Sequence, residues 1–62
     1  MKRAVDDLPE MFRVPLLLAT LGGLAYAEIA DVLHVPVGTV MSRLSRGRQL
    51  LLSLLEGRKQ PL

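Results

Sequence analysis

Residues 26–48, YAEIADVLHVPVGTVMSRLSRGR, determine the fold of this chain, because they predict two helices joined by a short turn. Ile29, Ala30 and Leu33 recur at helical spacing, and Tyr26 lies one turn before Ile29. Side chains spaced in this way share one face of a helix. The first of the two helices therefore has an apolar face that another element must cover.

The turn is marked by a proline and by the residues just before it. The first helix is expected to stop near Leu33, because Pro36 lacks an N–H and disfavours a helical conformation in the preceding residue. His34 then stands where helices commonly end in the left-handed conformation, in which histidine is enriched among non-glycine residues. Pro36 suits the first turn of the second helix, where its missing N–H costs nothing.

The second helix is predicted to carry an apolar stripe and a separate polar face. The stripe, which faces the core, consists of Val37, Val40, Leu44 and Leu51. A different sector, about 100° wide, carries hydroxyl and guanidinium groups and no acid. Its members are Thr39, Ser42, Arg43 and Arg46. Arg48 points away from this sector and would at most reach a flanking phosphate.

This polar sector has the chemistry of a DNA-reading surface. Guanidinium groups bind guanine edges through two hydrogen bonds, and hydroxyl groups reach bases or phosphates. Arginines on a helix are more often simply solvated, so the sector alone is a weak indication. The short preceding helix and three-residue turn strengthen it, because helix-turn-helix units are built in this way.

Three strings of the chain resemble region four of bacterial sigma factors of the extracytoplasmic-function (ECF) group. They are LPEMFR at 8–13, GLAYAEIADVL at 23–33 and PVGTVMSRLSRGRQLL at 36–51. The resemblance implies an all-α, four-helix domain containing a helix-turn-helix. It also implies that residues 1–62 are a single domain and a fragment of a larger sigma factor, whose upstream region binds the −10 element.

The resemblance also implies partners and site residues. The expected partners are the −35 element of promoter DNA, the flap of the RNA polymerase β subunit and, in many members, an anti-sigma factor. Ser42, Arg43 and Arg46 would contact promoter DNA, with Thr39 near the backbone or a base edge. The residues expected near phosphate, at the free N–H groups of the helix N-terminus, are Pro36, Val37 and Gly38.

Four positions depart from the family pattern. Met41 replaces a basic residue, Ser45 replaces an aromatic residue or histidine, and His34 replaces glycine. Ala25 replaces a serine or threonine helix cap, at a cost of ~0.5–2 kcal/mol, while Glu28 keeps half of a capping box. These departures bear on binding strength and on the preferred promoter sequence, and they leave the arginine-bearing face intact.

The composition bears on covalent and metal stabilisation and on the distribution of charge. The chain has 62 residues, no cysteine and one histidine, so we expect neither a disulfide nor a metal site nor a cofactor. Residues 1–35 hold three basic and five acidic side chains, whereas residues 36–62 hold five basic and one acidic. The positive half contains the proposed reading helix, as DNA binding requires.

We expect a cytoplasmic protein that is not an enzyme. The longest uncharged run, residues 14–27, is too short and too broken by Pro15 and two glycines to span a membrane. Acids follow the basic start where a signal peptide would need an apolar region. No catalytic residues are predicted, since the chain offers no nucleophile with a base, no paired carboxylates and no phosphate loop.

The remaining elements are predicted around the helix-turn-helix. One helical turn is expected at residues 2–7. The next helix, which glycines 22 and 23 end, either starts at Pro9 and bends at Pro15 or starts late, near Phe12, and the family resemblance favours the bent helix from Pro9. A last helix is expected over residues 36–55 and stops at Gly57. We expect Gly38 to permit close approach of the preceding helix or of DNA. In the leucine-rich end, Leu51 and Leu55 are predicted to pack inside, and the surface offered to a partner consists of Leu50, Leu52 and Leu54.

Two other functions fit the same pattern. An output domain of a LuxR-type response regulator shares the four-helix helix-turn-helix design and would bind palindromic DNA as a dimer. A purely protein-binding helical domain, engaging an anti-sigma factor or the polymerase flap, would bind no DNA even at low salt.

Overall fold

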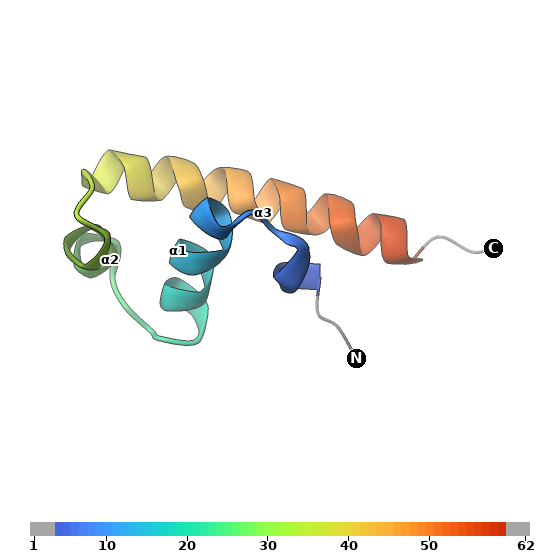
Figure 1. Cartoon of the computed structure of the whole chain (residues 1–62), viewed down its shortest axis with the longest axis horizontal. Helices are drawn as coiled ribbons and strands as arrows, with labels where there is room; N and C mark the ends of the chain where they lie inside the picture. Colours follow the sequence, from blue (N-terminus) through green and yellow to red (C-terminus); the bar gives the residue numbers. More distant parts are fainter. Residues whose placement is uncertain (1–3, 60–62) are drawn as a thin grey trace.

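The computed structural model describes residues 4–59 of the chain, and every regular element in this part is helical. A 3-10 helix, η1 (Ala4–Asp7), precedes three α-helices (Figure 1). These are α1 (Glu10–Thr20), α2 (Tyr26–Leu33) and α3 (Val37–Lys59). The all-α class is confirmed, but the expected four-helix count is not confirmed, because residues 4–59 form three α-helices and one 3-10 helix.

The first predicted turn is a 3-10 helix because it is too short to propagate an α-helix. The backbone N–H of Leu8 donates to the carbonyl of Val5 at 3.2 Å, which is the three-residue spacing of a 3-10 helix. A single turn gains too few hydrogen bonds to offset the cost of nucleating an α-helix. Lys2 and Arg3, which the sequence placed in this turn, lie outside the described residues.

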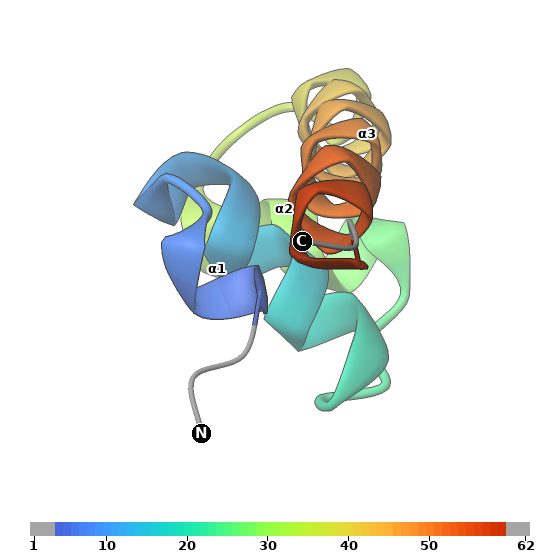
Figure 2. The same ribbon diagram turned by 90° about the vertical axis from the view of Figure 1, so that its right-hand side faces the viewer.

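The long helix α3 lies on one side of the molecule, and the other elements pack against its lower face in Figure 1. The view along α3 shows η1 and α1 beneath it, with α2 behind (Figure 2). Both α1 and α2 contact α3 more extensively than they contact each other. The fold is therefore held together mainly through α3.

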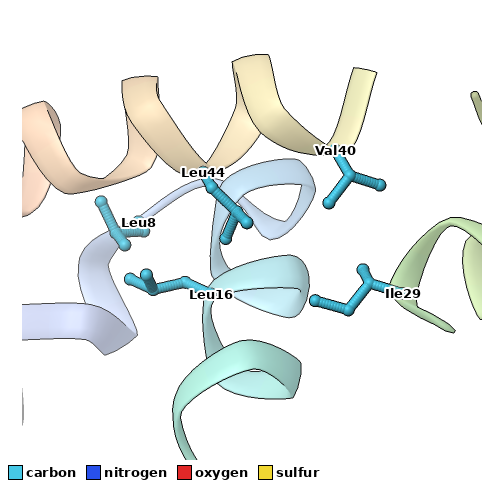
Figure 3. Close-up of a cluster of buried hydrophobic side chains, with 5 residues drawn as sticks. All are labelled: Leu8, Leu16, Ile29, Val40 and Leu44. Carbon is cyan, nitrogen blue, oxygen red and sulfur yellow. The ribbon is translucent and has the colours of Figure 1, made fainter. Parts of the chain in front are cut away.

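Each of the four elements or its flank contributes to one apolar core. The fully or almost fully buried members, drawn in Figure 3, are Leu8, Leu16, Ile29, Val40 and Leu44. Ile29 from α2 and Val40 from α3 have no exposed surface, and Leu44 is 1% exposed. The side chain of Ile29 thus joins the first helix of the predicted helix-turn-helix to the second.

The apolar stripe of α3 differs from the prediction at both ends. Val37 is 45% exposed, because a side chain in the first turn points back toward the helix N-terminus, beyond the elements that cover Val40. At the other end Leu54 packs against the core, whereas Leu55 is 38% exposed. The residue that follows Leu51 on the buried face is therefore Leu54, three positions on, and not Leu55, four positions on. Leu50 and Leu52 are exposed, as predicted.

Helix α1 continues through Pro15, which is buried within it. Pro9 occupies the position before the helix, and its carbonyl accepts hydrogen bonds from the N–H groups of Phe12 and Arg13 at 3.0 and 2.9 Å. The helix ends at Thr20, and Gly23 has a φ of 67°, a value that glycine adopts without strain. The predicted start and end of this helix are confirmed.

Gly47 lies where α1 crosses α3. A Cβ atom placed on Gly47 would lie 3.3 Å from the Cβ of Phe12, so a larger residue fits here only if Phe12 shifts by a few tenths of an ångström. At Gly38 and Gly57 an added Cβ would meet nothing. Of the two alternatives expected at Gly38, close approach of α2 is therefore wrong, and close approach of DNA stays a prediction. The expected stop at Gly57 is also wrong, because α3 runs on to Lys59.

We expect Gly47→Leu to destabilise the domain by about 1–3 kcal/mol, because the new side chain must push α1 away from α3. The control is Gly57→Leu, on the same helix in open space, where replacing glycine by a better helix former should not destabilise. Urea unfolding followed by circular dichroism measures both changes. Equal effects of the two substitutions would contradict the close helix crossing.

His34 ends α2 in the left-handed conformation, as predicted. Its φ is 58° and its ψ is 45°, and it is the only non-glycine residue of positive φ in the described part of the chain. The N–H of Val35 donates to the carbonyl of Ala30 at 3.1 Å, which closes the end of the helix. The turn between the two helices is thus fixed by local hydrogen bonds.

We expect His34→Gly to stabilise the domain by about 1 kcal/mol, because glycine reaches this conformation without a Cβ clash. A change of this size should raise the melting temperature by roughly 4–8 °C in a domain of this length. His34→Ala is the control, since it removes the imidazole and keeps the Cβ atom. A similar rise for His34→Ala would show that the imidazole, not the backbone, is the source of the effect.

Candidate nucleic-acid interface

The N-terminus of α2 keeps one half of a capping box. The Oε1 atom of Glu28 accepts a hydrogen bond from the backbone N–H of Ala25 at 2.8 Å. Ala25 has no side-chain oxygen with which to complete the box, so the other half is lost, as the sequence predicted. Glu28 therefore carries the capping of the first helix of the helix-turn-helix.

Tyr26 and Arg48 join α2 to the middle of α3. The Nη2 group of Arg48 donates a hydrogen bond to the hydroxyl of Tyr26 at 3.3 Å. Tyr26 is 38% exposed and is not a member of the core cluster, which corrects its predicted place on the apolar face. Arg48 is turned toward α2 and away from the polar sector, in agreement with the prediction. The sequence offered no sign of this pairing between distant residues.

The predicted site residues all lie on α3 or just before it, with different exposure. Pro36, Val37 and Gly38 are exposed at its N-terminus. Ser42 and Arg46 are exposed one turn apart, whereas Thr39 and Arg43 are half-buried. The carbonyl of Pro36 accepts hydrogen bonds from the N–H groups of Thr39 and Val40, so the first turn is fully formed.

A shallow depression runs along the exposed side of α3. The residues that line it are Met41, Ser42, Ser45, Arg46 and Gln49. It brings together two predicted residues, Ser42 and Arg46, with three that the prediction of site residues did not include. Gln49 lies about 20° from Ser42 around the helix, so extending the helical spacing by two turns would have found it.

Arg43 borders a different depression, where α3 meets α1 and the end of α2. The residues lining this second depression are Glu10, Met11, Val14, Pro15, Leu33 and Arg43. Arg43 therefore lies at the edge of the polar face, on a depression that Glu10 of α1 also lines, and not in the same depression as Arg46. The polar sector predicted from the sequence is thus divided between two neighbouring surfaces.

The charge of α3 has one sign along most of its length. From Val37 to Leu55 the helix carries three arginines and no acid, and Glu56 is the first acidic residue. A positively charged surface without acidic side chains attracts a polyanion such as the phosphate backbone of a nucleic acid.

Within the described residues, no group of three or more histidine, aspartate or glutamate side chains could hold a metal ion. The helices of these residues also lack the combination of length and hydropathy that a transmembrane span needs.

Comparison with known proteins identifies the family of this helix-turn-helix domain. The family model described as Sigma-70, region 4 matches residues 1–51. The chain belongs to the sigma-70 region 4 family. Its matched part includes η1, α1, α2 and the first half of α3, so the family covers the whole candidate interface.

The relatives of this region-4 domain are ECF sigma factors. The chain is 42% identical over 60 residues to the ECF RNA polymerase sigma-E factors of Escherichia coli (strain K12) and Salmonella typhi. It is 47% identical over 51 residues to the ECF RNA polymerase sigma factor SigE of Mycolicibacterium smegmatis. These alignments cover 97% and 82% of this chain but only 29% and 20% of the relatives. The chain is a region-4 domain of the ECF group, and it spans less than a third of the curated relatives that it matches.

Proposed function

We propose that this region-4 domain binds the −35 element of promoter DNA through α3, as the promoter-reading part of a sigma factor that directs RNA polymerase to initiate transcription. The observation that carries the proposal is the exposed face of α3, where Ser42 and Arg46 stand together on a helix without acids from Val37 to Leu55. The relatives are named as RNA polymerase sigma factors, which supports the same role.

Each predicted residue has a part in this proposal that fits its exposure. Arg46 is free to place its guanidinium on a guanine edge, and Ser42 can reach a base or a phosphate beside it. Thr39 and Arg43 are half-buried at the edge of this face. Their proposed contacts are with the sugar-phosphate backbone of the DNA strand that borders the groove. Pro36, Val37 and Gly38 would lie near a phosphate at the helix N-terminus.

A binding assay across salt concentrations tests this proposal. The fluorescence anisotropy of a labelled duplex with a −35-type element should rise on adding the domain, at lower concentrations than with a scrambled duplex. The logarithm of the affinity should fall linearly with the logarithm of the salt concentration, by roughly 0.9 per phosphate contacted. Equal affinity for the two duplexes at every salt concentration would refute promoter recognition by the domain alone.

A second candidate function, protein binding, is favoured by the far end of α3. Leu52 is 59% exposed and Leu50 is 36% exposed. Both lie C-terminal to the proposed DNA-reading face, which consists of the depression lined by Met41, Ser42, Ser45, Arg46 and Gln49. Exposed apolar patches tend to be interfaces. We propose that this end contacts the RNA polymerase flap or an anti-sigma factor in addition to the DNA contact. If Leu50→Glu together with Leu52→Glu leaves binding to the polymerase flap and binding to the anti-sigma factor both unchanged, this contact is wrong.

A further inference from the structure

Two large apolar side chains are exposed on the part of α3 that the proposed function places against DNA. Met41 is 54% exposed and Val37 is 45% exposed. They stand four residues apart, so they are neighbours on the helix surface. Neither belongs to the core cluster or packs against it. The first turns of α3 therefore present a small apolar ridge, Val37 and Met41, beside the polar face.

The apolar ridge opens onto the DNA-reading face. Met41 lines the same depression as Ser42, Ser45 and Arg46, so it shares one surface with the hydroxyl groups and the guanidinium. In a helix-turn-helix, the N-terminal residues of the second helix are the ones that contact base edges in the major groove. A ligand that lies on Arg46 and Ser42 must therefore also approach Met41.

The major groove offers one apolar group on its base edges, the C5-methyl group of thymine. We propose that Met41, supported by Val37, contacts a thymine methyl group, and that this contact makes the domain select thymine at one position of its site. The inference rests on the proposed function. Nucleic acid fits this ridge better than an apolar protein surface does, because Met41 shares its depression with Arg46 and α3 carries no acid from Val37 to Leu55.

Replacing thymine by uracil tests the contact, since it removes the methyl group and keeps every hydrogen-bonding group. The duplex is the tightest binder selected from a random pool, with its thymines replaced one at a time. The wild-type domain should lose roughly three- to tenfold in affinity at one position, as expected for one buried methyl group. Met41→Ala should bind the thymine duplex weaker by the same factor and should be insensitive to uracil at that position.

Leu52→Ala is the matched control, because Leu52 is equally apolar, 59% exposed and on the same helix but outside the depression. This variant should keep the full sensitivity to uracil. Both substitutions are at exposed positions, and circular dichroism establishes that each variant is folded. The reciprocal probe is 5-methylcytosine, which should bind the wild type more tightly than cytosine at that position and should make no difference to Met41→Ala.

The outcomes separate this inference from the function on which it rests. If Arg46→Ala weakens binding but uracil has no effect at any position, promoter binding stands and the methyl contact is wrong. The contact is also wrong if wild type and Met41→Ala lose the same factor on replacement by uracil. If the pool yields no duplex that binds better than a scrambled one, both the proposed function and the contact fail.

Discussion

Replacing Leu44 by alanine is expected to leave most of the domain unfolded at 25 °C. Leu44 is 1% exposed and lies in the cluster to which η1's flank, α1, α2 and α3 all contribute (Figure 3). Removing a buried leucine side chain costs about 2–5 kcal/mol, because burial is lost and a cavity remains. The whole stability of a domain this small is rarely above roughly 3–5 kcal/mol. The loss is therefore comparable with the total.

Helical circular dichroism against temperature and urea measures this effect. The control is Leu52→Ala, the same substitution at a residue that is 59% exposed, and surface changes of this kind usually stay within about 0.5 kcal/mol. Leu44→Ala should lack a cooperative transition, or show one at a much lower midpoint. If the two variants melt alike, the core does not lie where α3 meets the other helices.

Replacing Arg46 by alanine is expected to weaken DNA binding by about 1–3 kcal/mol, which corresponds to roughly five- to 150-fold. The size follows from the proposed paired hydrogen bonds between the guanidinium group of Arg46 and a guanine edge. Arg46 is exposed in the depression that also holds Ser42, so its loss should not unfold the domain. Isothermal titration or anisotropy with the selected duplex measures the change.

The matched control for this prediction is Arg58→Ala, which removes the same charge from the C-terminal end of the same helix. It should matter little if the DNA lies on the first half of α3. Arg46→Ala should also reduce the preference for the selected duplex over a scrambled one, whereas loss of a phosphate contact weakens both alike. Equal losses for Arg46→Ala and Arg58→Ala would show that the DNA-reading face is misplaced.

The helix-turn-helix could be predicted from the sequence because its signals are local. Pro36 forbids a continuous helix, His34 tolerates the left-handed conformation, and Glu28 caps the backbone three residues before it. These effects act over one turn of chain and do not depend on the rest of the fold. The glycine end of α1 at residues 22 and 23 is predictable for the same reason.

Features that depend on packing between distant residues could not be predicted in this way. The assignment of Leu54 and Leu55 was reversed, because a step of three or four along a helix changes which side chain faces the core and only the covering elements decide. The tight contact at Gly47 is with Phe12 on another helix. The bond between Arg48 and Tyr26 likewise joins residues whose proximity is a result of the fold.

The sequence predicts which candidate site residues share one side of α3. It does not predict how the neighbouring helices divide that side into separate depressions. Helical spacing placed Ser42 and Arg46 together, and the structure agrees. It also grouped Arg43 with them, whereas α1 and the end of α2 give Arg43 a separate depression shared with Glu10. Helical spacing describes the side chains of a single helix. It therefore cannot show that a neighbouring helix separates Arg43 from Ser42 and Arg46 on the protein surface.

The central claim, that the first half of α3 reads promoter DNA, is tested most directly by an amide NMR titration. The 62-residue domain would be titrated with a duplex carrying a −35-type element and with a scrambled duplex, at low and moderate salt. The account predicts shifts confined mainly to residues 36–49 that are larger for the −35-type duplex and persist at moderate salt. Absence of shifts with either duplex, or shifts centred on residues 50–57, would contradict it.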